Sequence, residues 1–249
     1  MSLDVVYSGS QALDLYVPPG ATTLCVYLHG GGWRLGSRKD GPRPADAGFF
    51  EQVTSMGLAV ASVGYRLSTE AVYPAQSADV AAALRFLSSY PHGCARTVLW
   101  GASAGGQLAA IAALTAPVPI AAAVCWFPPT DFDALAKDIE EAGGTGDRSA
   151  SSREGQLIGA GLDERPDLAA AASPVNHVRP GAPPFLLVHG TADRAVPPRQ
   201  SSRLADALTA AGGSATVELI PGASHMFREL DDAAMEAVVR RSVDFLLSA

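Results

Sequence analysis

The segment from Thr97 to Ile111 constrains the fold of this chain more than any other. It opens with Thr-Val-Leu-Trp, a short apolar run rich in residues that favour β-strands, and this run stops at Gly101. A helix-forming run starts directly after Ser103, so a strand turns sharply into a helix with a serine at the corner. Glycines on both sides lack a Cβ atom and let neighbouring backbone pass close by. The pattern predicts a serine held in a strained backbone conformation.

A serine at such a corner can act as a nucleophile. The helix that follows directs its free N–H groups and the positive end of its dipole back toward the corner. These groups stabilise the negative charge that develops when a hydroxyl attacks a carbonyl group. We therefore predict Ser103 as a nucleophile. Because Gly-x-Ser-x-Gly also arises by chance in a chain with 25 glycines, the remaining sequence has to supply its partners.

Strand-like and helix-like runs alternate along most of the 249 residues. This predicts an α/β protein with a mostly parallel central sheet, an antiparallel amino-terminal hairpin and helices on both faces. Strands are expected at 3–7, 12–17, 22–28, 58–63, 97–100, 120–127, 184–189 and 215–220. Further helices are expected at 45–56, 74–90, 198–211 and 231–247. The chain is expected to form one domain over residues 1–249, in which residues 130–172 are an irregular excursion and a small lid.

The segments that follow four of the expected strands each carry a polar residue: His29, Ser103, Asp193 and His225. Because parallel strands place their carboxyl ends at one edge of the sheet, we expect these residues to converge there. His225 lies in a loop that can swing over this edge, and we predict it as the general base. Asp193 is predicted as the acid that orients the imidazole, with Asp131 as the rival acid.

Three consecutive glycines follow His29. They let the backbone bring N–H groups against an oxyanion, and we predict the N–H groups of Gly31, Gly32 and Ala104 as an oxyanion hole. The side chain of His29 is expected to hold the loop by hydrogen bonds.

Taken together, these motifs resemble a known family. His-Gly-Gly-Gly-Trp at 29–33, Gly-Ala-Ser-Ala-Gly-Gly at 101–106, the Asp193 turn and the His225 loop occur in the order of an α/β-hydrolase. Within that fold the chain resembles the hormone-sensitive-lipase-like and feruloyl/acetylxylan-esterase-like carboxylesterases, over residues 11–248. The resemblance implies Ser103, Asp193 and His225 as a catalytic triad in a serine esterase with an acyl-enzyme intermediate. The amino-terminal cap helices of larger members are absent, which favours short-chain or aryl esters.

Large apolar side chains near these motifs are expected around the acyl and alcohol pockets of the substrate. They are Trp33, Phe127, Phe132, Leu157, Ile158, Met226 and Phe227.

Two other functions stay open at this point: an arylformamidase-type amide hydrolase, and a non-catalytic member of the fold that binds a small ligand. A nucleotide-binding oxidoreductase is disfavoured because residues 101–106 do not fit Gly-x-Gly-x-x-Gly. A metal hydrolase is disfavoured because no His-x-x-x-His or His-Glu-x-x-His spacing occurs. We expect no cofactor and no metal.

Charge and cysteine content limit the partners. A formal net charge of −7 disfavours nucleic acid or an anionic membrane surface, and the arginines are scattered along the sequence. An odd count of 3 cysteines favours free thiols in a reducing compartment. No apolar run reaches the roughly 20 residues that span a bilayer. We expect a cytoplasmic protein with a small-molecule ester as substrate, and a homodimer stays open.

Overall fold

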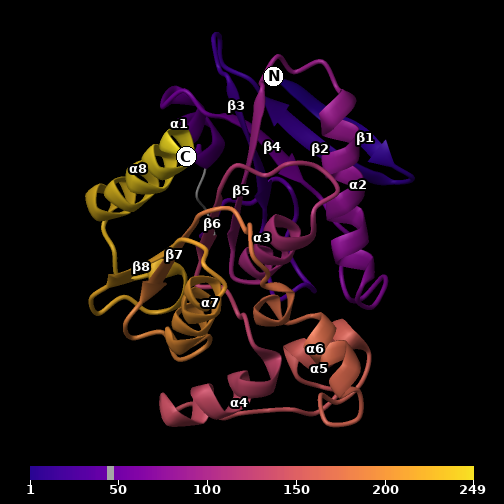
Figure 1. Cartoon of the computed structure of the whole chain (residues 1–249), viewed down its shortest axis with the longest axis vertical. Helices are drawn as coiled ribbons and strands as arrows, with labels where there is room; N and C mark the ends of the chain where they lie inside the picture. Colours follow the sequence, from indigo (N-terminus) through magenta and orange to yellow (C-terminus); the bar gives the residue numbers. More distant parts are fainter. Residues whose placement is uncertain (44–47) are drawn as a thin grey trace.

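The structure, a computed structural model, describes residues 1–43 and 48–249. Within these residues, eight strands form one sheet in the order β1-β2-β4-β3-β5-β6-β7-β8 (Figure 1). The strands are β1 (Ser2–Ser8), β2 (Gln11–Tyr16), β3 (Thr23–Leu28), β4 (Ala59–Val63), β5 (Arg96–Ala102), β6 (Ala123–Trp126), β7 (Phe185–Gly190) and β8 (Ala215–Ile220). The predicted α/β class is confirmed.

Strand direction follows the expected scheme. β1 and β2 pair as an antiparallel hairpin, and β2 also runs antiparallel to β4. From β4 through β3 and β5 to β8, all neighbours are parallel. All six residues of β3 are buried, as expected for a strand covered on both faces. The carboxyl ends of β3, β5, β6, β7 and β8 therefore meet at one edge of the sheet.

Helices cover both faces of the sheet (Figure 1). One apolar cluster packs α2 (Ala75–Ser89), α3 (Ala104–Thr115) and α7 (Arg199–Ala210) onto one face. A second cluster packs α1 (Phe49–Ser55) and α8 (Asp232–Ser248) onto the other. The helix expected at 45–56 is α1 from Phe49 onward, and part of its expected start lies outside the described residues.

The prediction that residues 130–172 are irregular was wrong. This segment contains α4 (Phe132–Glu141), α5 (Arg153–Ile158) and α6 (Pro166–Ala171), which lie together at one end of the molecule (Figure 1). Side-chain caps start two of these helices: Asp131 Oδ1 accepts from Ala134 N at 3.2 Å, and Ser152 Oγ accepts from Gly155 N at 2.9 Å. Such caps satisfy N–H groups that lack a partner in the first turn, so even short helices form between glycine-rich stretches.

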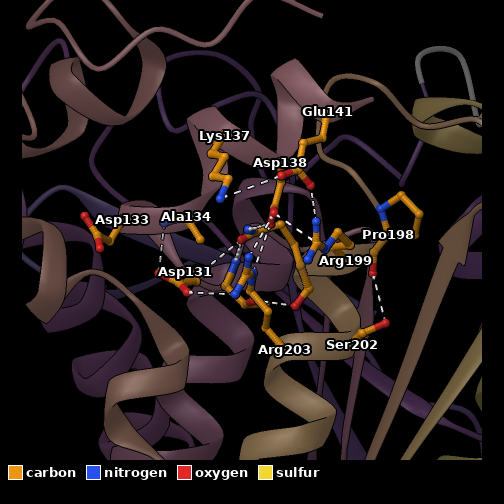
Figure 2. Close-up of polar contacts among 12 residues, drawn as sticks. Asp131, Asp133, Ala134, Lys137, Asp138, Glu141, Pro198, Arg199, Ser202 and Arg203 are labelled. Atoms are coloured by element: carbon orange, nitrogen blue, oxygen red, sulfur yellow. Dashed lines mark hydrogen bonds and ion pairs between the residues drawn. The ribbon is translucent and has the colours of Figure 1, made fainter. Parts of the chain in front are cut away.

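A buried carboxylate fixes α4 to α7 (Figure 2). Asp138 on α4 is 1% exposed and accepts hydrogen bonds from Gln200 Nε2 at 2.7 Å. Arg203 of α7 donates to the same carboxylate through Nε at 3.0 Å and Nη2 at 2.9 Å. Burial acts to raise the pKa of Asp138, but the contacts with Arg203 and Gln200 outweigh it and lower the pKa. The first helix of the 130–172 segment is therefore anchored to the main body of the protein.

Candidate active site

The turn between β5 and α3 places Ser103 at the edge of the sheet. Ser103 has φ 54° and ψ −119°, a strained conformation for a residue with a side chain. A Cβ on Gly101 would lie 2.1 Å from the carbonyl oxygen of Gly105, and one on Gly105 would lie 2.0 Å from that of Leu28. Only glycine fits at either position. The two glycines thus permit the close packing that holds the serine in this conformation.

A continuous chain of hydrogen bonds leads away from the Ser103 hydroxyl. Ser103 Oγ lies 3.1 Å from His225 Nε2, and His225 Nδ1 lies 2.6 Å from Asp193 Oδ2. A carboxylate accepts the Nδ1 proton, which leaves Nε2 free to accept from the serine hydroxyl. The Phe127 ring packs edge-on against the imidazole with centroids 4.8 Å apart. Three residues far apart in the sequence therefore meet, with the spacing that proton transfer requires.

Both carboxylate oxygens of Asp193 accept hydrogen bonds. Oδ1 accepts from the backbone N–H groups of Ala195 and Val196, each at 2.9 Å, while Oδ2 faces His225. The buried His189 lies beside this carboxylate, with its Nε2 atom 3.5 Å from Asp193 Oδ2. Burial acts to raise the pKa of Asp193, but His189 and His225 outweigh it and hold the pKa far below its ordinary value. The carboxylate is therefore ionised at neutral pH.

Asp131, the rival acid, has a different position. Its carboxylate caps α4, where Oδ1 accepts from Ala134 N, and Oδ2 lies 3.9 Å from Arg203 Nη1. The imidazole of His225 is bonded to Asp193 instead.

The glycine loop after β3 lies against this hydrogen-bonded group. Gly31 and Gly32 have φ 114° and 59°, in the left-handed region that favours glycine. A Cβ on Gly31 would lie 2.1 Å from the carbonyl oxygen of Leu35. Among the described residues, the N–H groups of Gly31, Gly32 and Ala104 donate to no protein acceptor. These donors are free to bind an anionic oxygen.

His29 lies beneath the loop as a structural residue. Its Nδ1 donates to Gly30 O at 2.7 Å, and its own carbonyl accepts from the Tyr65 hydroxyl at 2.8 Å. The two rings stack with centroids 4.3 Å apart. Burial lowers the pKa of His29 to about 4, so the ring is neutral at pH 7.

A cavity of about 1080 Å³ opens above Ser103. Of the apolar residues expected around it, Trp33, Phe127 and Met226 line the cavity wall. The other four do not line it, so their prediction as pocket residues was wrong; they are Phe132, Leu157, Ile158 and Phe227. Phe132 packs on Trp33, and Phe227 packs on Trp126 and Phe127. All four side chains are buried in the hydrophobic core instead.

The cavity is also lined by charged side chains that the sequence analysis did not single out. They are Arg34, Arg43, Arg153, Arg194 and Arg228, with Asp40, Asp147 and Glu154. They come from five loops and helices, and no spacing in the sequence connects them.

No group of three or more His, Cys, Asp or Glu residues in the described part of the chain could hold a metal ion. Cys25, Cys94 and Cys125 are free thiols. Among the helices of residues 1–43 and 48–249, none has the length and apolar character to cross a membrane.

The chain is similar to known esterases over most of its length. The BD-FAE family model matches residues 13–208. Esterase LipQ of Mycobacterium tuberculosis is 28% identical over 240 residues, which cover 92% of this chain and 56% of LipQ. Esterase LipC of the same organism is 30% identical over 243 residues, covering 90% of this chain and 59% of LipC. The chain thus spans a little over half the length of these two curated relatives.

Among solved structures, a truncated form of a carbohydrate esterase from gut microbiota has a TM-score of 0.80 to this chain. It is 27% identical, and the match covers 95% of this chain and 90% of that one. The resemblance to α/β-hydrolases of the hormone-sensitive-lipase-like and feruloyl/acetylxylan-esterase-like group is confirmed.

Proposed function

This chain belongs to the BD-FAE family, and from that premise we propose that it is a serine hydrolase that cleaves carboxylic esters through an acyl-enzyme. One observation carries the proposal: the hydrogen-bonded series Ser103, His225, Asp193 at the floor of an open cavity. A serine hydroxyl is a weak nucleophile until an adjacent base takes its proton, and the base works best when a third group fixes its tautomer. All three parts are present at hydrogen-bond distance.

In the first half of the reaction, Ser103 Oγ attacks the carbonyl carbon of the ester while His225 Nε2 accepts the hydroxyl proton. The carbonyl π electrons move to oxygen, and the N–H groups of Gly31, Gly32 and Ala104 donate to this oxyanion. When the tetrahedral intermediate collapses, the bond to the alcohol oxygen breaks and His225 returns the proton to the leaving alcohol. The acyl group stays on Ser103. Throughout, the Asp193 carboxylate stabilises the imidazolium without taking its proton.

In the second half, a water molecule takes the place of the alcohol. His225 accepts one of its protons as the water oxygen attacks the acyl carbon, and the same N–H groups hold the oxyanion. Collapse of this intermediate breaks the bond to Ser103 Oγ, which regains a proton from His225. The products are the carboxylic acid and the free enzyme.

The walls of the cavity suggest which esters fit. Trp33, Phe127 and Met226 provide apolar surface beside Ser103, and Ile139 of α4 lines the same space. Because Asp138 anchors α4 to α7, we assign α4 as a fixed wall that bounds the substrate. Short-chain and aryl esters suit such a bounded site. The buried thiols of Cys25 and Cys125 support the reducing cytoplasm as the place of action.

An active-site label tests the proposal directly. A p-nitrophenyl organophosphate transfers its phosphoryl group only to an activated serine, and we expect one equivalent on Ser103, located by peptide mass spectrometry. Release of p-nitrophenol should match the label in amount. Label on other serines, or none on Ser103, contradicts the assignment. A series of p-nitrophenyl esters from acetyl to palmitoyl, with N-formylkynurenine as an amide, then defines the preferred bond and chain length.

A further inference from the structure

Four arginines that line the cavity have no ionic partner. Arg34, Arg153, Arg194 and Arg228 are exposed, and none has a carboxylate oxygen within 4.0 Å among the residues that the structure describes. Arginines elsewhere on the protein are commonly ion-paired, as Arg66 is with Asp79 at 2.7 Å. Unpaired guanidinium groups gathered around one cavity are therefore unusual for a chain of net charge −7.

The acidic groups of the same cavity form no ion pair with these four arginines among the described residues. Asp40 Oδ2 accepts from the backbone N–H of Ser37 at 2.7 Å and from its hydroxyl at 3.1 Å. Asp147 accepts from Ser149 N at 2.9 Å. Glu154 is next to Arg153 without forming an ion pair, and burial raises its pKa. The described lining of the cavity thus holds more arginines than acidic residues, five against three.

Arg153 lies against the glycine loop. A Cβ placed on Gly32 would be 3.2 Å from Arg153 Cδ and 3.9 Å from its Nε, so the side chain lies along the glycine loop. Arg153 stands at the start of α5, which Ser152 caps. Across the loop, Arg34 Nη1 donates to Gln156 Oε1 of α5 at 3.3 Å. Two guanidinium groups thus flank one side of the cavity, next to the proposed oxyanion donors.

The other two arginines belong to the loops that carry the rest of the hydrogen-bonded series. Arg194 follows Asp193 directly, and Arg228 lies three residues after His225. All four arginines therefore line the cavity that contains Ser103. Clefts lined by charge of one sign attract ligands of opposite charge and speed their association.

We propose that the substrates of this protein are esters that also carry a carboxylate group, bound by Arg153 together with the neighbouring arginines. The inference rests on the proposed ester hydrolysis and specifies its substrate class. A planar guanidinium matches a carboxylate through two parallel hydrogen bonds, a geometry that a neutral ester cannot use. The carboxylate sits on the acyl part or on the alcohol part of the ester, and the test separates the two.

Two pairs of esters of similar size form the test. In the first pair, the anion of methyl hydrogen succinate carries a negative charge on its acyl side, and methyl butyrate is its neutral partner. In the second pair, the anion of 4-acetoxybenzoic acid carries the negative charge on its alcohol side, and phenyl acetate is its neutral partner. Acid release in a pH-stat at pH 7.5 gives kcat/KM for all four esters. We expect at least one anionic ester to exceed its neutral partner about tenfold or more, as steering and binding by several arginines allow.

Variants connect that preference to the arginines. Arg153→Gln should lower the ratio of anionic to neutral kcat/KM several-fold. Arg153→Gln combined with Arg34→Gln, Arg194→Gln and Arg228→Gln should abolish the preference. Arg85→Gln is the matched control, because Arg85 is an exposed arginine on α2, outside the cavity. It should leave all four values unchanged. Raising the salt concentration from about 0.01 M to about 1 M should also reduce the preference, since it shortens the Debye length. Circular dichroism checks that each variant is folded.

The outcomes separate the two proposals. Equal kcat/KM within both pairs, with measurable hydrolysis, overturns the anionic-substrate proposal and leaves ester hydrolysis standing. A preference that survives substitution of all four arginines overturns it as well, because another part of the protein would then produce it. Failure to hydrolyse any of the four esters, with no organophosphate label on Ser103, overturns the proposed function and this inference with it.

Discussion

Asp193 Oδ2 lies 2.6 Å from His225 Nδ1, while Oδ1 of the same carboxylate accepts two backbone N–H groups from its own turn. The orientation of the imidazole is thus determined by a group that is itself held rigidly. A carboxylate at this position accepts from Nδ1–H and so keeps Nε2 available for the serine.

Replacing the carboxylate by an amide tests this relationship. In Asp193→Asn the side-chain NH₂ can face Nδ1, which shifts the proton to Nε2 and removes the base. We expect kcat to fall by about 10⁴, with the fold retained. The matched control is Asp131→Asn, which alters the rival acid and should change kcat less than tenfold. Near-normal turnover of p-nitrophenyl acetate by Asp193→Asn would show that another group orients His225.

The two glycines of the oxyanion loop should respond differently to a methyl group. In Gly31→Ala the new Cβ would lie 2.1 Å from a backbone carbonyl at φ 114°, so the loop must deform. In Gly32→Ala the new Cβ would lie 3.2 Å from the flexible Arg153 side chain at φ 59°, a contact that movement of the arginine relieves. Loss of an oxyanion donor costs about 10² to 10³ in kcat. We expect at least the lower value for Gly31→Ala and a much smaller loss for Gly32→Ala, and the reverse order would contradict the assignment.

The buried ring of His29 should make the protein less stable in mild acid. Burial lowers its pKa from 6.5 to about 4, so between these pH values the unfolded chain binds a proton that the folded protein does not. The free energy of unfolding therefore decreases as the pH falls through this range, by up to roughly 3 kcal/mol from this one group. Urea unfolding at several pH values should show a weaker pH dependence in His29→Gln than in the wild type. Identical slopes would mean that His29 titrates alike in both states.

Arg203 should contribute more to stability than an exposed arginine with a similar partner. Arg203→Met removes the charged partner of the Asp138 carboxylate. This carboxylate is 1% exposed, so the cost of burying its charge is then offset by fewer hydrogen bonds. We expect a loss of about 2–4 kcal/mol in the free energy of unfolding. Arg165→Met is the control, because the Arg165–Asp167 pair is exposed on both sides and such pairs contribute little to stability. Equal losses in urea unfolding would argue against a structural role for the Asp138 contact.

Much of this architecture is predictable from the sequence because its signals are local. The strand-to-helix corner at Ser103 requires glycines within two residues, and hydrophobic periodicity marks α2 and α8 to within about two residues of their ends. The convergence of Ser103, Asp193 and His225 follows from one rule, that parallel strands present their carboxyl ends at one edge. Each polar residue stands in the turn or loop that follows a strand.

What the sequence did not reveal depends on contacts between distant segments. The helices α4 and α5 are short, and caps at Asp131 and Ser152 stabilise them together with packing against the core. Phe132 and Leu157 were predicted as pocket residues because they are large and apolar, yet both are buried in the core of the folded protein. The arginines are scattered along the chain, and only folding gathers several of them around one cavity.

The most direct measurement is the turnover of p-nitrophenyl acetate by Ser103→Ala beside the wild type, corrected for spontaneous hydrolysis. The variant keeps the cavity, the glycine loop and the His225–Asp193 pair, and lacks only the attacking oxygen. We predict a kcat lower by about 10⁴ to 10⁶, with unchanged circular dichroism. A kcat within tenfold of the wild type would contradict the assignment of Ser103 as the nucleophile.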